Sequence, residues 1–600
     1  MSDNFTRAIS VNQLAPETCR VVNVDGHTLA LFHHQGQVYA VDNRCPHMGF
    51  PLERGTVRDG ILTCHWHHAR FDLATGGTFD LFADDVPSFP VEIRDGAVWV
   101  DVTSYRDPQA YYLRRLDDGL EHELPLVLAK TVIALDDLYG DEGKGLNQAF
   151  IAGLQFGTRY RRNGWGQGLT MHTCFANLLP YLDDEDHSQA LYQGLSAIAR
   201  DTFGMPPRFI IGALPGDAPD MPTLKRWFRR FVEVRDGEGA ERCIVTAVRA
   251  GANDRDLAEM LFAAVTDHRY IQIGHVADFT NKALEALDRA GWSQSLAETV
   301  LSSLANGYVN ATRQEESNAW RNPIDLIEIL DQAFSALPDA LQTGMSLRGM
   351  WRDRESLLPI LLSDDPQAIA DALLDTLRAG ASEDQLAGTV AYAAALRIAR
   401  FHTSNEFTDW DTALHTFTFA NAIHQGIRRV IHAESPMSTR AELLRGVFDA
   451  AMSVYLDRFL NIPAAKIPEP DGANANADDL LNELPALLDR QQQVNQSAAL
   501  VARYWSTMGT SSNAHGDPAR LLPVLGKLLL REDRDFHTIQ TVEAAFHQYS
   551  LLKNSPEARN VLIAAVRYLA AHSPTVRAEG QTYHIAQRLH RGEKLFEDSE

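Results

Sequence analysis

Cysteine is scarce in this chain, with five residues in 600. So few thiols in so long a chain cannot form a disulfide scaffold, which places many cysteines in a short secreted domain. In a reducing compartment, a tight cluster of cysteine and histidine more often holds a metal. Two of the five, Cys45 and Cys64, belong to such a cluster, because a histidine follows each of them within three residues.

Long hydrophobic runs are also missing. The sequence has no stretch of about 18 apolar residues, the length that a membrane-spanning helix needs. Its first residues, MSDNFTRAISVNQLAPE, have neither the basic region nor the apolar run of a signal peptide. We therefore expect a cytoplasmic protein that does not enter a membrane.

Positive charge is in deficit, since 55 lysines and arginines stand against 79 acidic residues and the formal net charge is -24. Such a surface repels phosphate backbones and anionic lipids, so we expect no nucleic-acid partner. Glycine-rich phosphate loops, dinucleotide fingerprints and the GxSxG elbow are absent from the sequence as well. These absences give no support to hydride chemistry with a bound nicotinamide or flavin.

The apolar pattern divides the chain into a β-rich beginning and a helical remainder. From about residue 15 to 102, apolar and polar residues alternate between turn signals such as DG, QG and TGG, which predicts antiparallel strands. The period then changes to about 3.6 and stays helical almost to the end. The predicted fold class is α+β and multidomain, with an antiparallel β domain at residues 1–104, a helical domain at 105–461, a Pro- and Asn-rich linker at 462–479 and a C-terminal helical domain at 480–600.

Two short motifs in the β region carry the candidate metal ligands. The first is CPH, from Cys45 to His47, and after 16 residues the second is CHWH, from Cys64 to His67. Two thiolates and two imidazoles suit zinc, but a zinc finger pairs its cysteines in one turn and its histidines on a helix. Here each motif offers both residue types, which suits a [2Fe-2S] cluster with two cysteines on one iron and two histidines on the other. A zinc site stays the alternative.

On these residues the sequence resembles the Rieske family, in its soluble ferredoxin-like branch, over about residues 8 to 102. The resemblance implies that Cys45 and Cys64 bind the buried iron, and that His47 and His67 bind the outer iron near the surface. It also implies a β fold and a role in electron transfer. Further matching residues are Gly49, Pro51, Leu52, Gly55, Phe71, Asp72, Thr75 and Gly76.

The chain departs from the high-potential respiratory branch of that family. That branch has one more cysteine in each motif, joined as a disulfide, where this chain has Phe50 and Trp66. Ala69 and Phe71 stand in place of the serine and tyrosine whose hydroxyls point at the cluster. Because fewer hydrogen bonds then reach the cluster sulfurs, we expect a reduction potential toward the low end of the roughly -150 to +300 mV Rieske range.

Histidine–acid pairs in the helical region suggest a second metal site. The DxxHxxxxH motif that holds the mononuclear iron of Rieske oxygenases is absent. A histidine and an acid three or four residues apart on a helix nevertheless share one face of it. We expect this of two pairs, His275 with Asp278 and His402 with Glu406. These four residues are the first candidates for a non-haem iron site, and His415 is the next.

The two pairs occupy matching places in two similar segments, residues 254–284 and 382–414. The similarity has two interpretations. Either the segments are an internal duplication, which would suggest stacked helical hairpins, or they are two Ala- and Leu-rich helices that look alike by chance.

The sequence thus favours an iron–sulfur oxidoreductase. In this interpretation a [2Fe-2S] cluster accepts electrons one at a time from an external reductase or a ferredoxin-type donor. It passes them, within the chain or to a neighbouring chain, to an additional non-haem iron that uses O2 to oxidise a small organic substrate. The alternative is an electron-transfer or redox-sensing module on an α-helical interaction scaffold without a second metal.

Overall fold

The structure, a computed structural model, describes residues 4–103, 107–140, 143–469, 476–507, 518–552 and 555–595. The chain forms two compact units, residues 1–152 with 579–600, and residues 153–578. Residues 470–475 of the predicted linker lie outside the described residues. The proposed domain boundaries at residues 104, 461 and 479 stay predictions.

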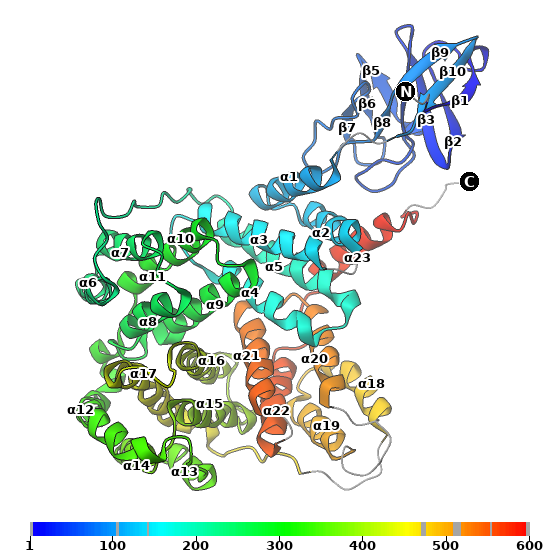
Figure 1. The fold of residues 1–600 in the computed structure, drawn as a ribbon. Helices are drawn as coiled ribbons and strands as arrows, with labels where there is room; N and C mark the ends of the chain where they lie inside the picture. The colour runs from blue at the N-terminus through cyan, green and yellow to red at the C-terminus, as the bar shows by residue number, and fades with distance from the viewer. Residues whose placement is uncertain are drawn as a thin grey trace. The chain divides into compact units, whose positions relative to one another are not determined.

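The β domain of the first unit consists of three small antiparallel sheets (Figure 1). The first sheet has the order β1 (Phe5–Ser10), β10 (Ala97–Asp101), β9 (Val91–Arg94). The second has the order β2 (Thr18–Val24), β3 (His27–His34), β4 (Gln37–Asp42), β8 (Ser88–Phe89), and the third β5 (Thr56–Arg58), β6 (Ile61–Thr63), β7 (Arg70–Asp72). The prediction of an antiparallel β domain is confirmed.

Tight hairpins set the register of the second sheet. Asp25 and Gly26 between β2 and β3 both have positive φ, at 47° and 87°, and so do Gln35 and Gly36 between β3 and β4. Two-residue turns of this kind match the twist of the strands they join. The central strand β3 therefore pairs with β2 from His27 to His33 and with β4 from Leu29 to His34, and its residues from Leu29 to Phe32 are buried in the core.

Three helices belong to the first unit with the β domain. They are α1 (Pro108–Glu121), α2 (Pro125–Tyr139) and α23 (Ala578–His590). Asp107 caps α1 by accepting from the N–H groups of Gln109 and Ala110, and a proline follows the cap. A fourth helix, α3 (Lys144–Arg159), contains the boundary between the two units.

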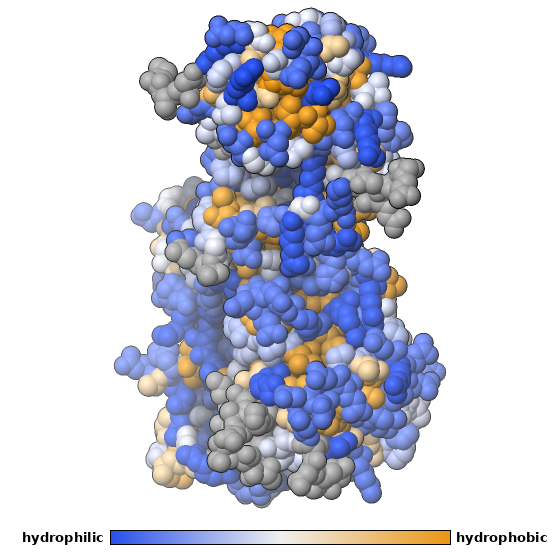
Figure 2. Space-filling view, turned by 90° about the vertical axis from the view of Figure 1, so that its right-hand side faces the viewer, coloured by the Kyte–Doolittle hydropathy of each residue, from blue (hydrophilic) through white to orange (hydrophobic). Residues whose placement is uncertain are grey.

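The described part of the second unit contains helices and no strand, which confirms the predicted all-helical region. None of the described helices is long and apolar enough to cross a membrane. The face in Figure 2 is mainly hydrophilic, and its hydrophobic residues lie in several patches, one of them over the β domain at the top. The helices of the second unit are α4 (Gln167–Leu178), α5 (His187–Thr202), α6 (Met221–Glu233), α7 (Gly237–Arg249), α8 (Asp254–Val265), α9 (His275–Ala290), α10 (Gln294–Ser302), α11 (Ala305–Asn310), α12 (Leu326–Gly344), α13 (Arg354–Leu361), α14 (Pro366–Arg378), α15 (Glu383–Ala399), α16 (Phe407–Val430), α17 (Met437–Leu456), α18 (Ala477–Leu488), α19 (Val494–Ser506), α20 (Leu521–Leu530), α21 (Phe536–Leu552) and α22 (Pro556–Ala571).

Four of these helices form a bundle within the second unit. α4 packs on α9, α9 on α16, α16 on α21 and α21 on α4, so the contacts close a ring (Figure 1). In a four-helix arrangement, side chains from facing helices meet in a shared interior, where metal and cofactor sites are often built. We call α4, α9, α16 and α21 the polar-core bundle, because many of its interior side chains are polar.

The two similar segments are both helix–turn–helix units, α8 with α9 and α15 with α16, but their turns differ. α9 begins at His275, whereas α16 begins at Phe407, five residues after His402. Glu406 is the residue that caps α16, and its backbone N–H bonds Asp409. The prediction that His402 and Glu406 share a helical face is therefore wrong, because the second turn is extended at this point. Whether the segments are a true duplication stays a prediction.

Candidate metal centres

Two turns of the β domain hold the paired cysteines and histidines. In the first, which follows β4, Cys45 N–H donates to the Phe50 carbonyl and Gly49 N–H to the Cys45 carbonyl, each over 2.8 Å. In the second, between β6 and β7, Cys64 N–H donates to the Ala69 carbonyl over 2.9 Å. Because backbone hydrogen bonds close both turns, the cysteine and histidine of each turn are held in place by the fold.

The two thiols contact each other in the interior. Cys45 is 3% exposed, Cys64 is 1% exposed, and a hydrogen bond joins their sulfurs. Accepting that hydrogen bond lowers the pKa of Cys64 to about 6, while donating it, together with burial, raises the pKa of Cys45. Backbone N–H groups of the residues that follow each cysteine point at its sulfur, which favours the thiolate that binds metal.

The two imidazoles face each other across the turns. The ring centroids of His47 and His67 are 4.8 Å apart, and the rings are nearly perpendicular. Burial is the largest cause that lowers the pKa of both, that of His47 to about 4, so both rings are neutral at neutral pH. Nδ1 of His47 is buried and has no hydrogen-bond partner among the described residues. A bound metal would satisfy this nitrogen, so the four side chains fit the predicted [2Fe-2S] cluster.

Aromatic side chains join the turns where the high-potential branch of the resembled family has a disulfide. The rings of Phe50 and Trp66 lie 5.9 Å apart, and Trp66 packs on His67 at 4.4 Å. On the other side, Phe82 contacts the His47 ring at 5.0 Å. These contacts hold aromatic side chains against His47 and His67 without a covalent link between the turns, and the His67 ring stays exposed.

A second group of metal-binding side chains lies inside the polar-core bundle. His275 of α9, His415 of α16 and His537 of α21 place ligand nitrogens within 4.8 Å of one another, and we call these three the histidine layer. Nε2 of His275 lies 3.2 Å from Nε2 of His415. Phe279 and Phe536 pack against the His275 ring and add apolar walls.

Two rings of the histidine layer, those of His275 and His415, have strongly lowered pKa values. Burial, reinforced by the neighbouring rings, lowers the pKa of His275 to about 3 and that of His415 to about 4. The rings are therefore neutral at neutral pH, the form in which histidine is a ligand. Nδ1 of His415 lies 2.5 Å from the Asp411 carbonyl, so it carries the proton and donates, which leaves Nε2 as the acceptor toward Nε2 of His275.

A carboxylate lies beside the third ring of the layer. Oδ2 of Asp411 lies 4.0 Å from Nδ1 of His537, which is too far for a hydrogen bond, and Oδ1 accepts a 2.8 Å hydrogen bond from the Tyr568 hydroxyl.

The turn that precedes His275 is strained. Tyr270, Gln272 and Ile273 have φ of 40°, 51° and 49°, in the left-handed region, and Gly274 has φ of 94°. A β-branched residue such as Ile273 is rare in this region. Each non-glycine residue held there costs about 1–3 kcal/mol of folding free energy. A Cβ on Gly274 would lie 2.8 Å from Cβ of Phe419, so only glycine fits. Strain of this kind is typical of functional sites, and here it sets the first residue of α9.

One level farther along α9 and α21, the bundle holds a buried lysine between two glutamates. Nζ of Lys282 lies 2.9 Å from Glu285 and 2.6 Å from Glu543, and the Asn177 amide donates to both carboxylates. We call these four residues with His547 the lysine layer. Glu285, Glu543 and His547 also satisfy the spacing of a metal site, but the Lys282 ammonium already pairs with both carboxylates.

The structure places the five second-site candidates differently. His275 and His415 come together, whereas Asp278 accepts a hydrogen bond from Gln540, between the two layers. Burial raises the pKa of Asp278 to about 7 although the charge of Lys282 opposes this. Nδ1 of His402 lies 2.6 Å from the Ser404 hydroxyl. Among the described residues, neither His402 nor Glu406 belongs to a group of side chains that could hold a metal ion.

His537 was missing from the sequence-based set. The segment FHTIQTVEAAFHQ places His537, Gln540, Glu543 and His547 on one helical stripe, much as α9 places His275, Asp278, Lys282 and Glu285. Comparing the polar stripes of the two helices would have pointed to it.

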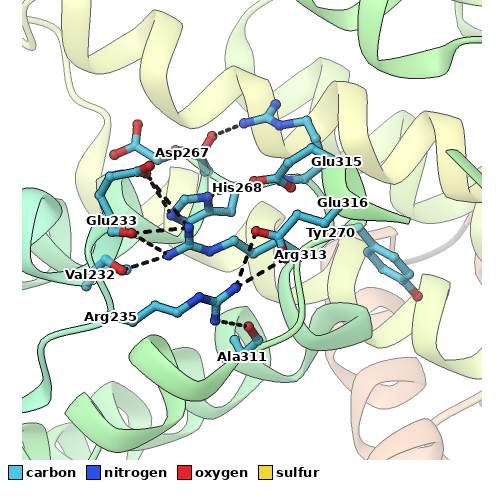
Figure 3. Close-up of polar contacts among 12 residues, drawn as sticks. Val232, Glu233, Arg235, Asp267, His268, Tyr270, Ala311, Arg313, Glu315 and Glu316 are labelled. Carbon is cyan, nitrogen blue, oxygen red and sulfur yellow. Dashed lines mark hydrogen bonds and ion pairs between the residues drawn. The ribbon is translucent and has the colours of Figure 1, made fainter. Parts of the chain in front are cut away.

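Another buried histidine has a structural environment instead (Figure 3). Nδ1 of His268 lies 2.8 Å from Glu315, and Nε2 lies 3.6 Å from Glu233. Arg313 donates to the Val232 carbonyl at 2.7 Å, and Arg235 donates to the Ala311 carbonyl at 2.8 Å. Both nitrogens of this ring face carboxylates, so His268 ties the end of α6 to the 311–316 segment.

Comparisons with known proteins concern the β domain. The family model described as Rieske [2Fe-2S] domain matches residues 4–90. The ferredoxin component of the naphthalene 1,2-dioxygenase system from Pseudomonas aeruginosa is 27% identical over 104 residues, which are 17% of this chain and 100% of that protein. The 3-phenylpropionate/cinnamic acid dioxygenase ferredoxin subunit of Photorhabdus laumondii is 36% identical over 77 residues, 12% of this chain and 73% of the subunit. Among solved structures, the ferredoxin of carbazole 1,9a-dioxygenase from Nocardioides aromaticivorans IC177 is 25% identical with a TM-score of 0.16, covering 16% of this chain and 98% of that one.

Proposed function

The chain belongs to the Rieske [2Fe-2S] family through residues 4–90, and from this premise we propose that it is an iron–sulfur oxidoreductase with a second iron site in its helical unit. The β domain would accept electrons one at a time from an external reductase or ferredoxin-type donor. The histidine layer would hold a non-haem iron that receives them for O2-dependent oxidation of a small organic substrate. The observation that carries the second half is the convergence of three imidazoles from three helices.

In the β domain, Cys45 and Cys64 would bind one iron of the cluster, and His47 and His67 the other. A [2Fe-2S] cluster held there supplies one-electron oxidation and reduction. The protein contributes the closed turns that fix the ligands, the N–H groups that face the sulfurs, and the aromatic rings that connect the two turns. Phe50 and Trp66 in particular would hold the turns together in place of a disulfide.

In the polar-core bundle, His537 takes the place of Asp278, His402 and Glu406 in the proposed ligand set. Imidazole nitrogens suit iron, so His275, His415 and His537 would hold an iron that supplies the O2 chemistry. His415 presents Nε2 because its Nδ1 proton bonds the Asp411 carbonyl, and Asp411 also faces His537. Phe279 and Phe536 would keep water from the His275 side.

Iron content tests the proposal. Full-length protein, purified without oxygen and loaded with iron, should hold about three irons per chain, two in the cluster and one in the histidine layer. His415→Ala and His537→Ala should each reduce this to about two without changing the visible absorption of the cluster. His402→Ala is the matched control and should leave about three.

Two results would contradict parts of this proposal. A wild-type content of about two irons would remove the second site and favour the electron-transfer or redox-sensing module on a helical scaffold. Loss of one iron in His402→Ala but not in His537→Ala would restore the sequence-based ligand set.

A further inference from the structure

Helix α2 makes a polar contact with the first metal-binding turn. Lys130 Nζ donates a 2.5 Å hydrogen bond to the carbonyl oxygen of Pro46, the residue between Cys45 and His47. Lys130 lies beyond residues 4–90, so the family pattern does not supply it. The helical extension of this chain therefore brings a positive charge to the backbone that carries two proposed cluster ligands.

Asp84 connects this lysine to a second cation. It contacts Lys130 Nζ, and its Oδ1 accepts a 2.9 Å hydrogen bond from Nε of Arg115 on α1. Although burial opposes ionisation, the charges of Lys130 and Arg115 hold the pKa of Asp84 below its ordinary value. Lys130 and Asp84 are 19% and 18% exposed, so water screens the pair only partly.

Arg115 holds the segment around Asp84 in place. It donates to the carbonyls of Leu81 at 2.9 Å and Ala83 at 3.2 Å, and its other arm pairs with Asp118 at the surface. Phe82, within this segment, packs on the His47 ring. Arg115 thus has a structural role. Of Arg115, Asp84 and Lys130, it is Lys130 that forms a hydrogen bond with the turn between Cys45 and His47.

We propose that Lys130 sets the reduction potential of the Rieske cluster, as a residue of the helical extension that stabilises the reduced state. Reduction adds one electron and hence one negative charge to the cluster. A fixed positive charge beside the turn stabilises that charge more than it stabilises the oxidised cluster, and it acts in a partly desolvated place. Removing the charge therefore lowers the potential, and removing the opposing charge of Asp84 raises it.

This inference rests on the cluster half of the proposed function and is independent of the histidine layer. It also links the two kinds of structure in the first unit. Any movement of α2 that separates Lys130 from Pro46 would make the cluster a stronger electron donor.

A redox titration of the full chain, followed by the electron paramagnetic resonance signal of the reduced cluster, tests the proposal. At the wild-type midpoint potential, the ratio of reduced to oxidised cluster should fall at least about threefold in Lys130→Met. That change corresponds to about 28 mV, because tenfold is about 59 mV for a one-electron couple. Methionine fits, since Lys130 and Pro46 line a cavity of about 820 Å³.

Three further variants separate charge from shape. Lys144→Met removes the same charge from an exposed position in the first unit and should leave the ratio unchanged. Lys130→Arg keeps the charge and should restore most of the wild-type ratio. Asp84→Asn should shift the ratio in the opposite direction, and it tests the proposal even if Lys130→Met does not assemble the cluster.

The proposal is overturned if Lys130→Met matches Lys144→Met, if Lys130→Arg is as low as Lys130→Met, or if Asp84→Asn does not raise the ratio. A wild-type protein without a Rieske signal would instead refute the proposed function. A normal signal whose potential ignores these changes would refute only the role of Lys130.

Discussion

Substitution of Lys282 by methionine tests what stabilises the interior of the polar-core bundle. The ammonium is 1% exposed and lies 2.9 Å and 2.6 Å from Glu285 and Glu543, which are 12% and 3% exposed. Although burial opposes the charge, these carboxylates hold the pKa of Lys282 well above its ordinary value. Lys282→Met leaves two buried carboxylates without a counter-charge, and breaking a buried pair in this way costs about 3–5 kcal/mol.

Lys225→Met is the matched control, because Lys225 also bridges two glutamates. Its Nζ lies 2.8 Å from Glu259 and 2.6 Å from Glu442, but the lysine is 17% exposed and the carboxylates 27% and 15%. Solvent screens this pair more, so its loss should cost about 1 kcal/mol. Hydrogen exchange in the peptides of α9 and α21 reports local opening of the bundle, and it therefore measures the destabilisation caused by Lys282→Met. If Lys282→Met is no more destabilising than Lys225→Met, Lys282 does not neutralise Glu285 and Glu543 as argued.

Three more variants test separate parts of the structure. The folded-state pKa of Asp278 is raised to about 7, so its stabilising contribution is full below about pH 4 and is lost as the pH rises through 7. Asp278→Asn should therefore raise the free energy of unfolding over wild type at pH 8 but not at pH 4, and an equal gain at both would contradict this. Cys64→Ser should abolish the visible absorption of the cluster, whereas Cys174→Ser, in the buried interior of α4, should retain it. Gly274→Ala should lower the free energy of unfolding by about 1–3 kcal/mol and reduce the iron content of the histidine layer, because its Cβ would meet Phe419 and its positive φ would be strained. Unchanged stability and iron content would show that the turn is not constrained.

The β domain and its metal-binding turns could be predicted because their signals are local. Alternating residues and DG or QG turns specify hairpins within a few residues, and the ligands Cys45 to His67 lie within one short segment. The resemblance also pointed to Phe50 and Trp66 as a departure from a disulfide. Only the structure shows that the two rings contact each other.

The bundle interior could be predicted only in part, because it depends on which helices pack together. Asn421 and His424 lie on one buried stripe of α16, and Gln548 of α21 forms hydrogen bonds with both of them. Sequence periodicity marks such a stripe but does not name the facing helix. For the same reason His537 was missed, since it lies on a helix far along the chain from His415.

The length of the turn before α16 and the place of the last helix, α23, could not be predicted from the sequence either. A gap of a few residues decides whether His402 lies on a helix or in the turn before it, and the periodic pattern does not resolve such a gap. Likewise, α23 belongs to the first unit although it comes last in sequence, because long-range packing and not local pattern decides domain membership.

The central claim is that electrons stored in the β domain are used at the histidine layer. Reduced, iron-loaded protein can be mixed with O2 and frozen at intervals, with the paramagnetic signal of the reduced cluster measured at each time. We predict that the cluster of the wild-type protein is reoxidised at least about tenfold faster than that of His415→Ala or His537→Ala, each with its cluster intact. Equal rates in the three proteins would show that the histidine layer takes no part in using these electrons.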